Sequence, residues 1–188
     1  ACAEYVSTKA EKLARKPSNA TFEQASAVPV SGTTALQGLR DVGKVQPGEH
    51  VLVNGASGGV GTFAVQIAKA LGAEVTGVCS GRNEEMVRSL GADHTIDYAK
   101  EDFTKGGQRY DVIFDLVANH PASECRRVLT PSGRHVPSSG HAGMGWIASA
   151  SMASMFSSQQ ERPFLAVAKR GDLEALTELI EAGKVTLP

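Results

Sequence analysis

The stretch HVLVNGASGGVG, residues 50–61, decides the fold of this chain. It begins with a short, largely apolar run, His50–Asn54, which is typical of a strand, and from Val60 to Leu71 the apolar residues recur at helical spacing. The glycines between the two runs permit a tight turn with bare backbone, and the start of a helix offers unpaired N–H groups and the positive end of its dipole. A strand, a Gly-rich turn and a helix in this order are typical of a site for the pyrophosphate of a dinucleotide.

The glycine spacing is Gly55-x-x-Gly58-x-x-Gly61, which is not GxGxxG, so the pattern alone is a weak indication. Its position between a strand and a helix, with a second strand following, favours dinucleotide binding. The alternative is a merely tight turn in an α/β protein that binds nothing.

Outward from this turn, predicted strands and helices alternate. Strands are expected at 50–54, 74–79, 94–98, 110–117 and 133–138, and helices at 60–71, 83–90 and 121–129. Strands buried on both faces and joined by helices form a parallel sheet with right-handed crossovers. The predicted fold class is therefore α/β, a doubly wound parallel sheet of the Rossmann type.

The N-terminal flank is predicted to be an extended segment followed by a helix. Residues 3–6 read as a strand, and Thr21 and Gln24 have the spacing of a capping box. We expect the helix that starts there to break at Pro29 and to resume over Thr33–Leu39.

The C-terminal flank is less regular. Met144–Ser158 predicts a mobile loop with a short helix, Phe164–Val167 a further strand, and Asp172–Ala182 an amphipathic helix closed by Gly183. Met152, Met155 and Phe156 suit an acceptor pocket, a subunit contact or ordinary core packing.

Composition excludes several classes of protein. The chain has 188 residues, a formal net charge of −1 and no basic block, which argues against a nucleic-acid partner. No apolar run approaches the ~20 residues of a membrane helix, and no signal peptide is visible. The three cysteines, Cys2, Cys79 and Cys125, form no CxxC motif, so we expect free thiols in a reducing cytoplasm and neither a disulfide nor a metal site.

The residues after the second predicted strand favour NADP(H) over NAD(H). An NAD site needs an acid there for the ribose hydroxyls, and residues 78–83 contain none. Ser80 and Arg82 instead suit a 2′-phosphate, although Arg82 could simply be a solvated residue at a helix start. Tyr98 ends the next strand, where its hydroxyl could reach the same phosphate or only cap the strand.

Further motifs occur in a fixed order along nearly the whole chain. They are Ala3-Glu4-Tyr5-Val6, AVPVSGTTA at 27–35, Val45-x-Pro47-Gly48, the Gly turn, Gly91-Ala92-Asp93, Ile96-Asp97-Tyr98 and Asp111-Val112-x-x-Asp115. Together they resemble the medium-chain dehydrogenase/reductase superfamily. The branch they resemble most is the zinc-independent, NADPH-dependent quinone oxidoreductases, which are often labelled zinc-type alcohol dehydrogenases.

The resemblance implies a Rossmann cofactor domain, here 21–188, and a remnant of a GroES-like substrate domain with its linker, here 1–20. Most of the GroES-like domain precedes Ala3 in the family, so we expect the chain to be most of the cofactor half of a longer reductase. The zinc ligands of the alcohol-dehydrogenase branch lie mainly in that preceding region, and no metal ligand is assigned here.

The resemblance also assigns the cofactor contacts. The pyrophosphate falls to Ala56, Ser57, Gly58, Gly59, Val60 and Gly61, and the 2′-phosphate to Ser80, Arg82 and Tyr98. Thr34 approaches the nicotinamide side. The family has small glycines near the nicotinamide after the fourth strand, but this chain has Val117-Ala118-Asn119, which puts the contact at Val117 in question. Residues 137–140 also depart from the more apolar family pattern.

The implied activity is hydride transfer from NADPH to a quinone, an enone or a related carbonyl, by a homo-oligomer. Catalysis in this branch is chiefly positioning, so no catalytic residue is assigned. The histidines His94, His120, His135 and His141 are expected to be non-catalytic, and Asp111 and Asp115 structural. The alternative function is a non-catalytic NADP(H)-binding fragment or interaction module.

Overall fold

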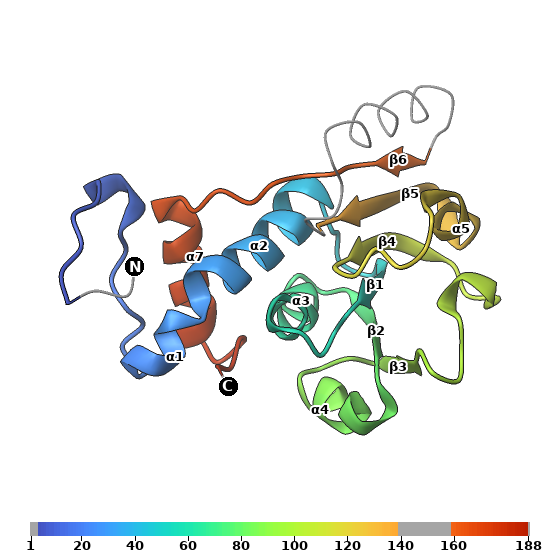
Figure 1. Ribbon diagram of the computed structural model, residues 1–188, viewed down its shortest axis with the longest axis horizontal. Coiled ribbons are helices and arrows are strands. Elements are labelled where there is room, and N and C mark those ends of the chain that lie inside the picture. The colour runs from blue at the N-terminus through green and yellow to red at the C-terminus, as the bar shows by residue number, and fades with distance from the viewer. Residues whose placement is uncertain (1–3, 139–158, 188) are drawn as a thin grey trace.

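The computed structural model describes residues 4–138 and 159–187, and its core is one parallel sheet (Figure 1). Six strands lie in the order β3-β2-β1-β4-β5-β6, and every neighbouring pair is parallel. They are β1 (His50–Asn54), β2 (Glu74–Cys79), β3 (His94–Asp97), β4 (Tyr110–Asp115), β5 (Leu129–Pro137) and β6 (Gln160–Glu161). This is the strand order of dinucleotide-binding folds, and it confirms the predicted doubly wound α/β class.

Both faces of the sheet are buried. Alternate residues of the central strands belong to two different hydrophobic clusters, one on each face. Val51 and Val53 of β1 pack with the helices on one face, whereas Leu52 packs with Ile113 and Cys125 on the other. This alternation is the period of two expected of a strand covered on both sides.

Helices cover the two faces and one end of the molecule. They are α1 (Phe22–Ser26), α2 (Thr33–Leu36), α3 (Gly59–Ala70), α4 (Glu84–Ser89), α5 (Ala122–Arg127) and α7 (Arg170–Glu181). Short 3₁₀ turns occur at Ala10–Lys12, Gly81–Asn83 and Phe103–Lys105.

The prediction that the first helix breaks at Pro29 is wrong. The predicted capping box is present, since Thr21 and Gln24 each accept the other's backbone N–H. Beyond it, wide π-type turns at Val28–Gly32 and Gln37–Val42 flank α2, and the chain stays helical. Proline lies at the first turn of the π segment, where it removes a hydrogen bond without ending the helix.

The helix that contains α2 lies close against the sheet at Gly38. A Cβ atom at this position would lie 2.5 Å from Cε2 of Phe114 on β4. Glycine is therefore required here by the close approach of helix and strand.

Three other predicted elements differ. Phe164–Val167 forms no strand, because Phe164 packs on Phe114 and the backbone of Val167 bonds to the Gln37 side chain. The last strand is β6, and β5 begins earlier than predicted, at Leu129. Residues 4–6 are exposed and form no strand, and Met144–Ser158 lies outside the described residues, as do Met152, Met155 and Phe156.

The C-terminal helix α7 forms hydrogen bonds with two parts of the N-terminal region. Asp172 on α7 accepts hydrogen bonds of 2.6 Å from Gln37 Nε2 and from Arg40 Nη2. At its other end, Glu181 Oε1 accepts both the backbone N–H and the hydroxyl of Ser18 at 2.8 Å. The N-terminal segment therefore lies beside α7 and away from the sheet (Figure 1).

The two described cysteines, Cys79 and Cys125, are buried and form no disulfide with each other. Among the described helices, none has the length and apolar character needed to cross a membrane.

Candidate cofactor-binding site

The candidate site lies at the carboxyl edge of the sheet, between β1 and β4. The strand order reverses there, since β2 lies on one side of β1 and β4 on the other. Asn54 and Asp115 are the last residues of these two strands and are paired in register. Ligands of open α/β sheets bind in the crevice outside such a switch point.

The Gly-rich turn leaves β1 abruptly. Gly55 has a φ of +90°, a left-handed conformation that glycine adopts without strain. The amides of Gly55 and Ala56 both donate to the carbonyl of Val78 on β2, at 3.1 and 2.9 Å. The turn is thus held to the sheet and directs the chain into α3.

Gly61 brings the start of α3 directly onto this turn. A Cβ atom on Gly61 would lie 2.1 Å from the carbonyl oxygen of Gly55 and 2.7 Å from the carbonyl carbon of Ala56. No side chain fits there, so the predicted close packing of helix on strand depends on this glycine.

The N-terminus of α3 presents unsatisfied amides. Gly58 is the N-cap residue and supplies no side-chain cap, and both Gly58 and Gly59 are exposed. Within residues 4–138 and 159–187, the amides of Gly59, Val60 and Gly61 have no hydrogen-bond acceptor. Open amides at a helix N-terminus form an anion-binding site, as the sequence predicts for the pyrophosphate.

The loop after β4 packs over the turn. Cγ2 of Val117 lies 2.9 Å from the point a Cβ atom on Gly55 would occupy, which places Val117 at the turn despite its departure from the family pattern. Asp115 Oδ1 holds this loop by accepting the amides of Val117 at 3.1 Å and Ala118 at 2.9 Å. This is the structural role predicted for Asp115.

Asn54 is a residue that the sequence prediction missed. Its Nδ2 donates to Asp115 Oδ1 at 2.8 Å and to Asn119 Oδ1 at 2.9 Å, so it ties the end of β1 to the loop after β4. Its place at the end of the strand, immediately before Gly55, was a signal that could have identified it.

Ala118 has a φ of +54°, so a residue that carries a Cβ atom adopts the left-handed backbone conformation. We expect Ala118→Gly to raise the free energy of unfolding by up to about 1 kcal/mol, because the left-handed region costs a residue with Cβ roughly 1–2 kcal/mol. Urea denaturation measures the change. Ala122→Gly, in α5, is the control and should lower stability; a loss at both positions would contradict the argument.

The residues predicted to bind the 2′-phosphate lie at the ends of β2 and β3. The amide of Tyr98 donates to the carbonyl of Cys79 at 3.1 Å, which brings the two strand ends together. Ser80 is half-buried, Tyr98 is 63% exposed, and Arg82 is exposed with no ion pair to any residue in the described ranges. Arg82 therefore has its guanidinium free for an anion.

Asp97 is an acidic residue close to the residues predicted to bind the 2′-phosphate, so its charge affects anion binding there. Its pKa is lowered, first by the amide of Ala99, and its Oδ2 lies 3.3 Å from Nζ of Lys100. A Cβ on Gly81 would lie 2.6 Å from the same oxygen. The carboxylate is thus ionised and partly neutralised by a lysine.

Thr34 is half-buried, and its hydroxyl donates to the carbonyl of Val30 at 2.7 Å, one helical turn earlier. Ser31, on the same helix, lies nearer the Gly turn: its Oγ is 3.4 Å from the Cβ position of Gly59. Ser31 was not among the predicted site residues, although it belongs to the motif at 27–35.

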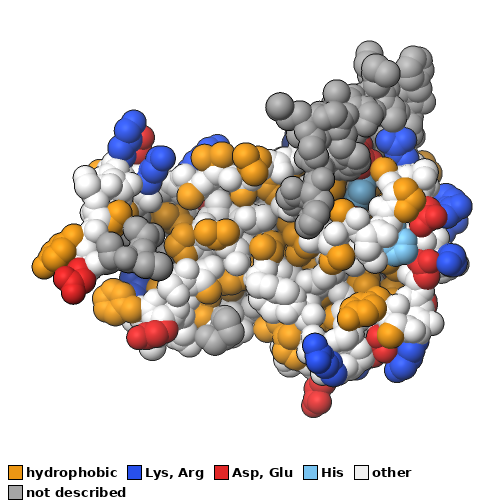
Figure 2. Space-filling model, in the orientation of Figure 1, with side chains coloured by type: hydrophobic (Ala, Val, Ile, Leu, Met, Phe, Trp, Pro, Cys, Tyr) orange, Lys and Arg blue, Asp and Glu red, His pale blue; other side chains and the backbone are white. Residues whose placement is uncertain are grey.

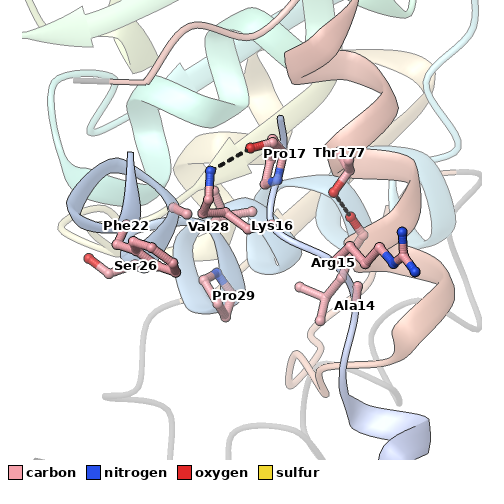
Figure 3. A pocket seen from close by; sticks show the side chains of 11 residues that line it. Ala14, Arg15, Lys16, Pro17, Phe22, Ser26, Val28, Pro29 and Thr177 are labelled. Carbon is pink, nitrogen blue, oxygen red and sulfur yellow. Dashed lines mark hydrogen bonds between the residues drawn. The ribbon is translucent and has the colours of Figure 1, made fainter. Parts of the chain in front are cut away.

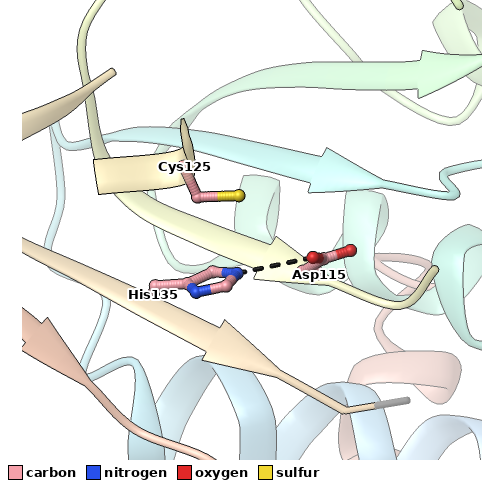
Figure 4. Close-up of side chains that lie close together, drawn as sticks. All are labelled: Asp115, Cys125 and His135. Carbon is pink, nitrogen blue, oxygen red and sulfur yellow. Dashed lines mark hydrogen bonds and ion pairs between the residues drawn. The ribbon is translucent and has the colours of Figure 1, made fainter. Parts of the chain in front are cut away.

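A buried polar group adjoins the site on the side of β5 and β6. His135 Nδ1 lies 2.6 Å from Oε1 of Glu161, and its Nε2 lies 3.4 Å from Oδ2 of Asp115 (Figure 4). Burial acts to lower the pKa of His135, but hydrogen bonds with Asp115, Cys125 and Glu161 outweigh it and raise the pKa to about 11. Burial acts to raise the pKa of Asp115, and the bond to His135 lowers it overall.

The other described histidines lie in ordinary surroundings. His94 Nε2 lies 2.9 Å from Glu74 Oε1, and His120 Nδ1 lies 3.2 Å from Glu124 Oε2. His141 lies outside the described residues. Asp111, at the start of β4, accepts from the amide of His50 at 2.9 Å. Asp111 therefore has a structural contact, as expected from the sequence.

A separate hollow of about 270 Å³ lies between the N-terminal segment, α1 and α7 (Figure 3). Arg15, Pro17, Phe22, Pro29 and Thr177 are among the residues that line it, and it includes no residue of the Gly turn. The hollow is therefore distinct from the candidate cofactor site.

Residues 59–180 match the model of a family described as "Zinc-binding dehydrogenase". The chain belongs to this family. The match begins in the Gly turn and extends almost to the end of α7, and it confirms the resemblance to medium-chain dehydrogenases and reductases.

Its relatives include named oxidoreductases. A chloroplast envelope quinone oxidoreductase homolog of Arabidopsis thaliana is 32% identical over 97% of this chain and 58% of its own length. The mitochondrial NAD(P)H oxidoreductase RTN4IP1 of Mus musculus is 41% identical over 61% of this chain and 31% of its own length. The chain thus spans 58% or less of the length of these relatives.

Solved structures agree in fold. The quinone oxidoreductase from Coxiella burnetii has a TM-score of 0.80 and 29% identity, over 92% of this chain and 53% of that one. CurK enoyl reductase has a TM-score of 0.82 and 30% identity, over 96% of this chain and 58% of its own.

Proposed function

We propose that this chain is the cofactor-binding portion of an NADPH-dependent oxidoreductase that transfers hydride to a quinone, an enone or a related carbonyl acceptor. The observation that carries the proposal is the open N-terminus of α3, packed through Gly61 onto the turn after β1. The relatives named as quinone oxidoreductases and enoyl reductases support the reaction class.

The residues present suit the cofactor in three places. The amides of Gly59, Val60 and Gly61 would hold the pyrophosphate, Ser80, Arg82 and Tyr98 the 2′-phosphate, and Val117 would lie on the nicotinamide side. Bound NADPH would supply the hydride. The contribution of the chain is to position the cofactor, which the hydrogen bonds of Asn54 and Asp115 accomplish by fixing the loop after β4.

The preference for NADPH rests on charge. Residues 78–83 contain no acid for ribose hydroxyls, and Arg82 has a free guanidinium. The carboxylate of Asp97 opposes binding of a 2′-phosphate, because it lies near Gly81. Lys100 offsets part of that negative charge.

We expect Arg82→Ala to weaken NADPH binding by about 10-fold or more and to leave NADH affinity nearly unchanged, because a charge-assisted hydrogen bond contributes roughly 1.5–3 kcal/mol. Fluorescence titration of both nucleotides measures it. Arg109→Ala, an equal change of charge at the other end of the sheet, is the control and should alter neither affinity. Equal losses for NADPH and NADH in Arg82→Ala would reject the 2′-phosphate role.

Steady-state oxidation of NADPH with a panel of quinones and enones tests the proposed activity. Turnover with any of them supports the reductase. Saturable NADPH binding without turnover would favour the second candidate, a non-catalytic NADP(H)-binding module. No saturable binding at all would overturn both.

The remaining expectations belong to the same proposal. These are a GroES-like remnant at 1–20, a cofactor domain at 21–188, a homo-oligomer and a cytoplasmic location. On the face shown in Figure 2 hydrophobic side chains occupy much of the middle and charged ones lie mainly near the edge. Large exposed apolar residues such as Phe22, Val30 and Leu165 suit contact with the remainder of a longer protein or with a second copy.

A further inference from the structure

Three buried side chains with metal-binding atoms meet beside the cofactor crevice. Asp115 comes from the end of β4, Cys125 from α5 and His135 from β5 (Figure 4). Their ligand atoms all lie within 4.8 Å of one another, and each residue is at most 2% exposed. Three separate elements therefore bring a thiol, an imidazole and a carboxylate to one point in the core.

This set of donors suits zinc. Zinc binds thiolate sulfur at about 2.3 Å and imidazole nitrogen or carboxylate oxygen at about 2.0–2.2 Å, in tetrahedral geometry. His135 Nε2 and Asp115 Oδ2 are 3.4 Å apart, close to the separation of two ligands on one such ion. Mixed sulfur and nitrogen ligands also exclude magnesium and calcium, which prefer oxygen alone.

Glu161 supplies the outer contact that a metal-binding histidine needs. Its Oε1 lies 2.6 Å from His135 Nδ1, which leaves Nε2 directed at Asp115. A carboxylate on the far nitrogen fixes the ring and its tautomer in zinc sites. Glu161 is itself buried, and its Oε2 has no hydrogen-bond partner among the described residues, only Arg126 Nη2 at 3.6 Å.

The charges around the group also suit a divalent ion. Two buried carboxylates, Asp115 and Glu161, lie here, and Arg126 Nη2 is 3.6 Å from Glu161 Oε2. With Zn²⁺ bound by the neutral imidazole, the thiolate and the carboxylate that such an ion requires, the charges of the ion, Cys125, Asp115, Glu161 and Arg126 sum to zero. The buried site can therefore accept the ion without an uncompensated charge, which would be costly in a protein interior.

We propose that Asp115, Cys125 and His135 form a zinc site with three protein ligands, with Glu161 as the outer partner of His135. The family's zinc ligands were expected in the region before Ala3, and no metal ligand was assigned to this chain from its sequence. The proposed site is therefore a different site from those of the family. It ties β4, α5 and β5 together at the edge where Asp115 holds the cofactor loop.

The experiment is refolding of the metal-free protein with Zn²⁺, or with Mg²⁺ as a control, followed by gel filtration and metal analysis. Cys125→Ser and His135→Gln remove ligands, and Cys79→Ser and His94→Gln are matched controls outside the group. Refolding with Co²⁺ adds a readout on the unmutated protein, since a thiolate ligand gives a sulfur-to-cobalt charge-transfer band.

We expect one zinc more per chain in the unmutated protein and in both controls than in Cys125→Ser or His135→Gln. Glu161→Gln should weaken zinc affinity about 10–100-fold, the usual effect of losing an outer partner. Equal zinc content in Cys125→Ser and Cys79→Ser overturns the proposal. Where the variants fail to fold, absence of the charge-transfer band in the unmutated protein overturns it as well.

Discussion

Replacing Gly61 with alanine is expected to reduce NADPH affinity on the order of 100-fold or more, about 2.7 kcal/mol. The new Cβ would lie 2.1 Å from the Gly55 carbonyl oxygen, and its three nearest neighbours are backbone atoms that cannot rotate away. The start of α3 must therefore move off the turn, which separates the open amides from the pyrophosphate they would bind. Overpacking of this kind also costs about 1–3 kcal/mol of stability.

Gly171→Ala is the matched control. Gly171 lies in the first turn of α7, a helix of 12 residues like α3, and an added Cβ there meets nothing within 4 Å. It should leave NADPH affinity unchanged and raise stability slightly, because alanine favours helix. Nucleotide titration and urea denaturation measure both effects, and an unaltered NADPH affinity in Gly61→Ala would contradict the assignment of the site.

Replacing Asp115 with alanine is expected to lower the free energy of unfolding by about 3–5 kcal/mol, the cost of breaking a buried charge pair. The substitution leaves His135 with Glu161 and Cys125 and removes the hydrogen-bond acceptor of the Val117 and Ala118 amides. Because that loop packs over Gly55, NADPH affinity should fall as well. Urea denaturation in the presence of a chelator measures the stability term without any contribution from metal.

Asp111→Ala is the control on the same strand. Asp111 is half-buried and accepts hydrogen bonds from the amide of His50 and the hydroxyl of Thr130. Its loss should cost about 1 kcal/mol and leave NADPH affinity unaltered. If Asp115→Ala cost no more than Asp111→Ala, the buried ion pairs would not stabilise this fold.

The sequence predicted the parts of the fold that depend on local pattern. Val51–Val53 and Val112–Phe114 are continuous apolar runs, which are typical of strands buried on both faces. The Gly turn marks where helix α3 begins. The proposed pyrophosphate site could be predicted from the same local pattern, because its donors would be backbone amides whose position depends on Gly55 and Gly61.

The features that the sequence did not predict depend on contacts between distant residues. Pro29 was expected to end a helix, but packing of Val28 and Gly32 in the core maintains it. Glu161 and His135 are 26 residues apart, and their pairing depends on β6 lying beside β5. The spacing of residues along the sequence does not indicate such a pairing. The buried group of His135, Glu161 and Asp115 was therefore not predicted, although His135 was considered.

The bonds between α7 and the N-terminal half have a consequence for synthesis of the protein. Gln37 and Asp172 are separated by 135 residues, and Ser18 and Glu181 by 163. The ribosome therefore releases α2 long before the helix that packs on it, and Leu176 can reach Gly32 only after the residues between them have been synthesised. We expect the nascent chain to expose this apolar surface until α7 has emerged, a period in which chaperones would have access to it.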